Sequence, residues 1–218
     1  MNFDLSAALA AITPGRPLIV TDADGVVLRF TGGLERYLNE LGLYLDLSTR
    51  RYSGAVKRQD DHTSLLDVEA QVLVEEFRAD LDDLEAVDGA CEALRSLKET
   101  ANIVVLSNIT ERQAEARRRN FQALGIDLPL IANDSGQGYT GGKGAVVKAL
   151  AARAGAKTFF IDDLPENLAE VGGAAPDVLL IHIAENPELR EYLSSGVRAH
   201  CLAETWEDAA AFIREQLG

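Results

Sequence analysis

The chain of 218 residues is long enough for one large domain, or for a core domain that carries an insertion. Apolar residues make up 47% and charged residues 26% of it, a balance typical of globular proteins that excludes disordered and collagen-like chains. Lys and Arg number 21 against 35 Asp and Glu, which gives a net charge of −14. Because such a surface repels phosphate backbones, we expect no nucleic-acid partner.

Apolar patterning and cysteine usage indicate neither a membrane protein nor a secreted one. The longest apolar runs, such as 17–20 and 178–181, are far shorter than the about 20 residues that cross a bilayer. The first residues lack the basic start and the cleavage site of a signal peptide. Cys91 and Cys201 have no metal-type spacing and are interpreted as reduced core residues. We therefore expect a cytoplasmic protein without a membrane partner.

Short and nearly continuous apolar segments predict the strands of a parallel sheet that is buried on both faces. They lie at 18–22, 103–107, 129–132, 158–162 and 178–183. Helices are predicted between them: Thr110 and Gln113 have the spacing of a capping box, and further helices are expected at 144–153 and 204–216. This alternation predicts an α/β fold with a doubly wound parallel sheet.

The stretch from residue 30 to residue 87 interrupts the alternation. It contains no strand-like run, and its apolar residues recur at helical spacing. Those residues are Leu34, Tyr37, Leu38 and Leu41, followed by Leu65, Leu66, Val72, Leu73 and Phe77. Since the stretch is too long for an ordinary connection, we expect residues 1–29 and 88–218 to form the α/β core and residues 30–87 to form a small helical insertion.

Side chains that could bind a ligand or take part in catalysis stand at the ends of the predicted strands 18–22 and 103–107. Asp22 and Asp24 end the first strand and are followed by a glycine. Ligands of open α/β sheets bind beyond the carboxyl ends of the strands, and two such acids can bind a divalent cation or divide nucleophilic and acid–base roles. Ser107 and Asn108 end the second strand and offer a hydroxyl group and backbone amides to phosphate oxygens.

Two later segments add a cation and a second pair of acids. Lys143 follows two glycines and precedes a predicted helix, so its ammonium group can reach a phosphate as a point charge. Asp162 and Asp163 follow an apolar strand, and Asn167 comes four residues after Asp163. Paired acids in such a position are costly unless they bind a metal or hydrogen-bond donors. Each feature alone is common, and their combination in this order points to phosphate chemistry.

In this order the four motifs resemble those of the haloacid dehalogenase superfamily, over about residues 17 to 185. The resemblance implies that Asp22 is the nucleophile that forms an aspartyl-phosphate. Asp24 would be the general acid and base. Ser107, Asn108 and Lys143 would bind the phosphoryl oxygens, because positioning and charge neutralisation dominate this reaction.

The resemblance also implies a Mg²⁺ cofactor, a hard ion that prefers oxygen ligands. Its ligands would be Asp22, the backbone carbonyl of Asp24 and Asp163, while Asp162 and Asn167 would support the site indirectly. The implied activity is that of a Mg²⁺-dependent phosphoric monoester hydrolase whose partner is a small phosphorylated metabolite.

Several other activity classes are considered for the same motifs. The dehalogenating branch of the superfamily lacks an acid two positions after its nucleophile, so Asp24 disfavours halide displacement. A phosphomutase that uses the same aspartyl-phosphate is the closest alternative. A phosphonate-cleaving relative would need an imine-forming lysine in the insertion, for which Lys57 is the candidate. A receiver-like signalling module has its acids in a different order and lacks the insertion.

The insertion resembles the small helical cap of the superfamily, which closes over the site and contacts the leaving group. It carries a basic cluster of Arg50, Arg51, Lys57 and Arg58, with His62 nearby. Such a cluster is typical of a solvated helix face, and recognition of a second anionic group on the substrate is the alternative. Structural roles are expected for Tyr52, His182, His200 and Trp206.

Overall fold

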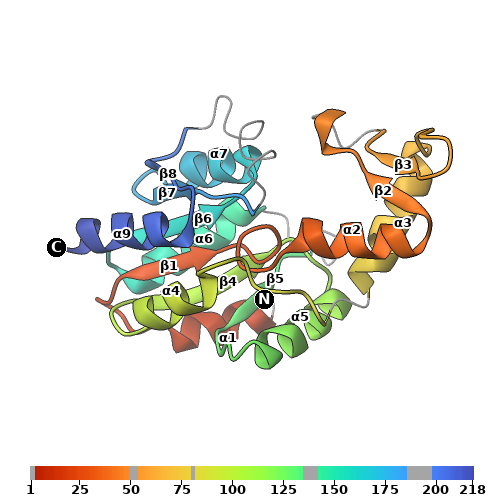
Figure 1. Cartoon of the computed structure of the whole chain (residues 1–218). Coiled ribbons are helices and arrows are strands. Elements are labelled where there is room, and N and C mark those ends of the chain that lie inside the picture. The colour runs from red at the N-terminus through yellow and green to blue at the C-terminus, as the bar shows by residue number, and fades with distance from the viewer. Residues whose placement is uncertain (1–2, 50–53, 80–81, 135–141, 186–197) are drawn as a thin grey trace.

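A computed structural model describes residues 3–49, 54–79, 82–134, 142–185 and 198–218. Its main sheet has the strand order β5–β4–β1–β6–β7–β8, and all neighbouring strands run parallel. The strands are β1 (Leu18–Thr21), β4 (Asn102–Ser107), β5 (Leu130–Ala132), β6 (Thr158–Asp162), β7 (Leu179–His182) and β8 (Cys201–Leu202). The predicted parallel α/β fold is thus confirmed (Figure 1).

Helices cover both faces of this sheet. Apolar side chains of α1 (Phe3–Ala11), α6 (Lys143–Ala154) and α7 (Pro165–Ala174) pack on one face. Those of α4 (Ala90–Leu97), α5 (Glu111–Ala123) and α9 (Trp206–Leu217) pack on the other. Within β1, Leu18 and Val20 face the first group of helices while Ile19 faces the second. Because successive strand residues point to opposite faces, two covered faces require the nearly continuous apolar runs of the sequence.

The capping and glycine signals in the sequence predicted the start of α5 and the end of α6 correctly. Thr110 forms the predicted capping box with Gln113 at the start of α5, and Gly155 ends α6 with a φ of 58°. Trp206 is fully buried, and its indole N–H donates to the Val26 carbonyl at 2.8 Å. Cys91 and Cys201 are free thiols, and both are half-buried and pack against the core cluster. No helix of the described segments combines the length and the apolarity needed to cross a membrane.

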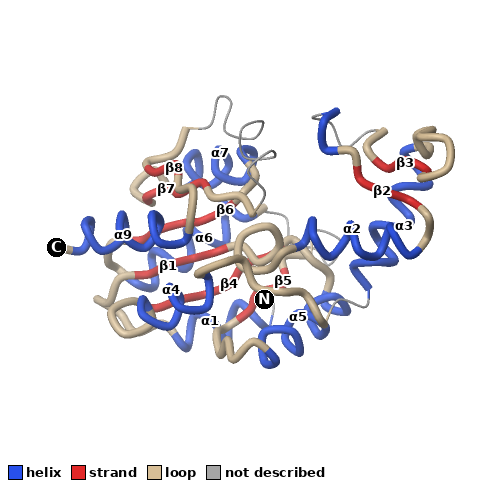
Figure 2. The backbone as a smooth tube through the Cα atoms, in the orientation of Figure 1, coloured by secondary structure: helices blue, strands red, loops and turns tan. Residues whose placement is uncertain are grey.

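The segment between β1 and α4 forms a small unit beside the sheet (Figures 1 and 2). It contains α2 (Phe30–Glu40), β2 (Leu43–Leu45), the short 3₁₀ helix η1 (Leu47–Thr49), β3 (Val56–Arg58) and α3 (Asp67–Ala79). The expectation that this stretch contains no strand was wrong, because β2 and β3 pair antiparallel. Each of them has 3 residues, which is too short to produce a recognisable alternation in the sequence.

Candidate active site

The carboxyl ends of β1, β4 and β6 bring the predicted site residues to one edge of the sheet. Asp22 follows β1, and its backbone N–H continues the sheet by donating to the Ile161 carbonyl at 2.9 Å. A cleft of about 590 Å³ opens there between the core and the inserted unit. Its lining includes seven of the predicted residues, namely Asp22, Asp24, Ser107, Asn108, Lys143, Asp163 and Asn167.

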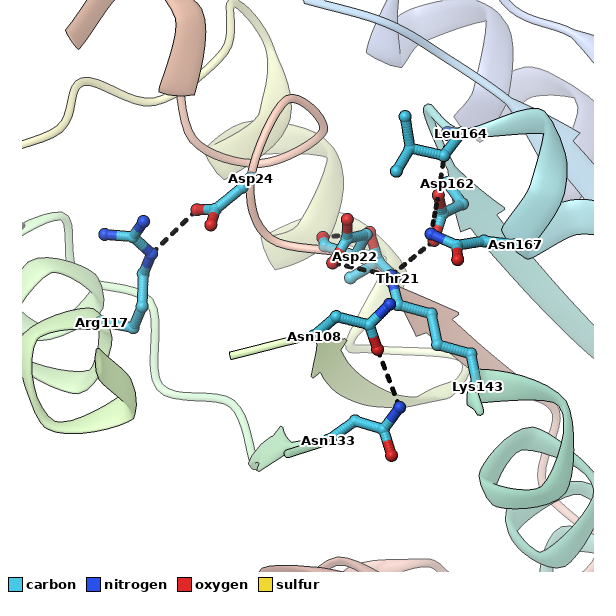
Figure 3. A network of polar contacts seen from close by, with 10 residues as sticks. All are labelled: Thr21, Asp22, Asp24, Asn108, Arg117, Asn133, Lys143, Asp162, Leu164 and Asn167. Atoms are coloured by element: carbon cyan, nitrogen blue, oxygen red, sulfur yellow. Dashed lines mark hydrogen bonds and ion pairs between the residues drawn. The ribbon is translucent and has the colours of Figure 1, made fainter. Parts of the chain in front are cut away.

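Lys143 lies at the centre of the site and is 1% exposed. Its Nζ is 3.0 Å from Oδ1 of Asp22 and 2.6 Å from Oδ2 of Asp162 (Figure 3). Burial alone would lower the pKa of this ammonium group, but the charges of the two carboxylates outweigh burial and raise the pKa. Lys143 therefore stays charged and can neutralise the oxygens of an anionic ligand.

Gly142 and Gly144, on either side of Lys143, leave room for a carboxylate that holds the start of α6. Oε1 of Glu170 accepts a hydrogen bond from the Gly144 N–H at 3.0 Å. A side chain at Gly142 would overlap the carboxylate of Glu170. Because a carboxylate is favourable at a helix N-terminus, Glu170 fixes the first turn of the helix that presents Lys143. The sequence pattern did not reveal this residue.

Asp162 is fully buried below the cleft and supports the site through both of its oxygens. Oδ1 accepts hydrogen bonds from Nδ2 of Asn167 and from the backbone N–H of Leu164, both at 2.9 Å. Oδ2 faces Lys143. Asp162 thus links β6 to the start of α7 and orients the ammonium group.

Three carboxylates gather around this lysine and form a candidate metal centre. Asp22, Asp162 and Asp163 each offer an oxygen, and these oxygens lie within 4.8 Å of one another. Burial raises the pKa of Asp22 to about 7, and burial together with the charges of Asp162 and Asp22 raises the pKa of Asp163 well above its usual range. One ammonium group does not balance three carboxylates, and carboxylate oxygens are the donors that Mg²⁺ prefers. The residues therefore fit a hard divalent cation.

Two neighbours place Asp163 against this cluster. Gly25 has a φ of +80°, and a Cβ at this position would lie 2.7 Å from Oδ2 of Asp163. Nε2 of the fully buried His182 lies 2.9 Å from the backbone oxygen of Asp163, and because a carbonyl only accepts, Nε2 carries the proton. The structural role expected for His182 is therefore that of holding the Asp163 backbone.

Asp24 turns its carboxylate away from Asp22, toward α5 (Figure 3). Its Oδ1 forms an ion pair with Nε of Arg117 at 2.8 Å, and the Arg117 side chain is 2% exposed. The sequence did not reveal Arg117, because it opens a run of three arginines that resembles a solvated helix face. The side chains of Arg118 and Arg119 are indeed 39% and 58% exposed, and they form ion pairs with Asp4, Glu111 and Asp82.

Ser107 and Asn108 stand at the end of β4, which flanks β1 on the side opposite to β6. The Ser107 side chain is buried at the end of β4. Oδ1 of Asn108 accepts a hydrogen bond from Nδ2 of Asn133 at 2.8 Å, and the backbone N–H of Asn133 donates to the Ser107 carbonyl at 2.8 Å. Asn133, which follows β5, therefore holds this turn, a role that the sequence did not indicate.

The basic cluster of the insertion lies partly outside the described residues, which exclude Arg50, Arg51 and Tyr52. Nζ of Lys57 pairs with Oδ2 of Asp46 at 2.6 Å, and Arg58 is exposed. Neither of them lines the cleft.

No protein-family profile matches this sequence, and no curated protein matches it either. Solved structures do match. A protein described as a phosphatase from Clostridium difficile superposes with a TM-score of 0.61 at 16% identity, covering 92% of this chain and 100% of its own. A HAD-superfamily hydrolase from Ehrlichia chaffeensis gives 0.55 at 17% identity, over 94% and 100%. A protein described as a β-phosphoglucomutase from Thermotoga maritima gives 0.57 at 16% identity, over 91% and 99%. The chain therefore shares the fold of this superfamily over most of its length.

Proposed function

Because the chain has the fold of the haloacid dehalogenase-superfamily hydrolases, we propose that it is a Mg²⁺-dependent phosphohydrolase for small phosphoric monoesters. The pairing of Asp22 with Lys143 at 3.0 Å on the floor of the cleft carries this proposal. A carboxylate nucleophile beside a fixed cation is suited to attack on a phosphorus that bears anionic oxygens. The phosphatase and the hydrolase among the similar structures support the same activity class.

In the first half of the reaction the substrate phosphoryl group lies between Lys143 and the Ser107–Asn108 turn, which bind its oxygens. A carboxylate oxygen of Asp22 attacks the phosphorus, and the bond from phosphorus to the substrate alcohol breaks. Asp24 gives a proton to the departing alcohol oxygen. To do so, its carboxyl group must leave the ion pair with Arg117, take up a proton from water and turn toward Asp22, because the ion pair holds it as a carboxylate away from the nucleophile.

In the second half a water molecule attacks the phosphorus of the aspartyl-phosphate. Asp24 takes the proton of this water, the bond from phosphorus to Asp22 breaks, and inorganic phosphate leaves. Asp22, the backbone carbonyl of Asp24 and Asp163 would hold Mg²⁺. When bound, the ion supplies positive charge to the carboxylate cluster and to the phosphoryl oxygens.

The proposal is tested by phosphate release from 4-nitrophenyl phosphate with Mg²⁺ and with excess chelator. We expect turnover that depends on Mg²⁺, is abolished in Asp22→Asn and persists in Asp82→Asn, a matched change in a half-exposed surface pair. Turnover in verified absence of metal, or in Asp22→Asn without deamidation, would contradict it. A phosphomutase, which uses the same nucleophile, would instead return the phosphoryl group to a sugar phosphate with little phosphate release.

A further inference from the structure

The wall of the cleft that faces the departing alcohol is largely apolar. The inserted unit provides most of this wall, through α2, α3 and the β2–β3 pair. The apolar side chains that line it are Phe30, Leu34, Leu45, Val56, Ala70 and Val74. Since the phosphoryl group is bound at the sheet edge, the rest of a substrate must lie against these side chains.

The charged residues of this wall are mostly acidic. Asp67 and Glu75 line it from α3, and Glu166 lines it from the start of α7. The one cation that the described lining adds to Lys143 is Arg78. Nη1 of Arg78 lies 3.2 Å from Oε1 of Glu75, and the guanidinium group stands 5.3 Å from the centre of the Phe30 ring. The positive charge of Arg78 is therefore already balanced by a carboxylate.

The other cations of the described insertion, Arg36, Lys57 and Arg58, do not line the cleft. Lys57 pairs with Asp46 at 2.6 Å. Arg36 lies 3.6 Å from Glu85 and lines a separate groove that borders the cleft at Gln71 and Glu75. Among the described residues, a second anionic group on the substrate would therefore lose its hydration beside Asp67 and Glu75, and the only cation that it would meet besides Lys143 is Arg78, which already pairs with Glu75.

We propose that the substrate is the phosphoric monoester of an apolar alcohol that carries no second anionic group. An uncharged or an amine-bearing alkyl chain fits the wall, because the aliphatic side chains cover the chain and the carboxylates of α3 tolerate an ammonium group. This inference rests on the proposed function, and it assigns substrate selection to the apolar face of α3 and its neighbours.

The test compares three esters of equal chain length: hexyl phosphate, 6-aminohexyl phosphate and 6-(phosphonooxy)hexanoate. With the Mg²⁺-loaded enzyme, we expect kcat/KM for the first two to exceed that for the carboxylate ester by about tenfold or more, since placing like charges together at a binding surface is strongly unfavourable. An equal or greater kcat/KM for the carboxylate ester would overturn the inference.

A pair of variants on one helix tests whether α3 makes this choice. Val74 lines the cleft, whereas Val72, two residues earlier, is 53% exposed and lines the separate groove. Val74→Lys is expected to improve kcat/KM for the carboxylate ester relative to hexyl phosphate by about tenfold, while Val72→Lys leaves the ratio unchanged. An unchanged ratio in Val74→Lys, with its melting temperature retained, would contradict the assignment.

A binding measurement tests the substrate preference independently of whether the protein hydrolyses phosphate esters. Calorimetric titration of the three esters into Asp22→Asn protein with Mg²⁺ measures the preference of the cleft without turnover. Failure of the wild-type enzyme to hydrolyse any ester, including the aryl phosphate, would refute the phosphohydrolase. The order of the dissociation constants would still decide the inference, which predicts the weakest binding for the carboxylate ester.

Discussion

Replacing Gly25 by alanine is expected to damage the acidic cluster through one added methyl group. Gly25 follows Asp24, has a φ of +80°, and lies against the carboxylate of Asp163. Two costs therefore combine at this position. One is the strain of a left-handed backbone conformation in a residue with a Cβ, and the other is the displacement of a carboxylate from the candidate metal centre.

The structure sets the size of both costs. A left-handed backbone with a Cβ costs about 1–2 kcal/mol, and each kcal/mol lowers the melting temperature of a protein of this size by about 2–4 °C. The new Cβ would lie 2.7 Å from Oδ2 of Asp163. Relief of this overlap to a normal contact of about 3.5 Å needs a shift of about 0.8 Å, well beyond the about 0.2 Å that metal–ligand distances tolerate. We therefore expect the Mg²⁺ affinity to fall by about tenfold or more.

Gly15→Ala is the matched control. Gly15 has a φ of +79°, nearly the same as Gly25, but a Cβ there meets no atom within 4 Å. Thermal unfolding in a Mg²⁺ titration should show a similar loss of stability in both variants without metal. Only Gly25→Ala should need more Mg²⁺ for half of the metal-induced stabilisation and for half-maximal hydrolysis. Equal Mg²⁺ requirements in the two variants would refute the placement of Asp163 in a metal centre that Gly25 makes possible.

Three further predictions concern the carboxylates and their partners. Burial raises the pKa of Asp22 from 3.8 to about 7, so ionisation of this residue destabilises the folded metal-free protein increasingly as the pH rises from about 4 to above 7. Asp22→Asn without metal should then melt higher than the wild type, with a larger difference at pH 8 than at pH 5, and a difference that shrinks toward pH 8 would contradict the prediction. Asp24→Asn should slow the hydrolysis of alkyl phosphates by about 10²–10⁴ in rate. It should slow the hydrolysis of aryl phosphates much less, because an activated aryl oxide departs without a proton. Equal losses for both substrate classes would show that Asp24 is not the acid. Arg117→Gln should lower the free energy of unfolding in urea by about 3 kcal/mol, since it leaves a largely buried carboxylate without its cation. Arg119→Gln, in a half-exposed pair with Asp82, should cost less than about 1 kcal/mol. Similar losses in the two arginine variants would mean that the Asp24 pair contributes little.

Much of the fold was readable in the sequence because burial on both faces of a sheet constrains every residue of a strand. The strand β1 is apolar up to Thr21, and β6 has the apolar run 159–161 between Thr158 and Asp162, so that acids stand at or just after the end of each strand. A parallel sheet places the ends of these strands at one edge, so Asp22, Asp162 and Lys143 were expected to lie close together. Their positions in the chain were sufficient to predict this proximity, since each residue stands at a strand end or a helix start that can be recognised from the local sequence.

Other features depend on how helices and loops pack across long stretches of chain, and local periodicity does not record this. The sequence shows Arg117 within a run of arginines, and only the packing of α5 beside the β1 loop turns this residue, rather than Arg118, toward Asp24. Likewise, the basic residues of the insertion attract attention in the sequence, yet the pairing of β2 with β3 directs Lys57 to Asp46 and leaves aliphatic side chains on the cleft. The sequence by itself determined which residues stand at the strand ends, because burial of each strand is a local constraint. The tertiary structure alone decided which side chains face the substrate, because that depends on the orientation of elements that are distant in the chain.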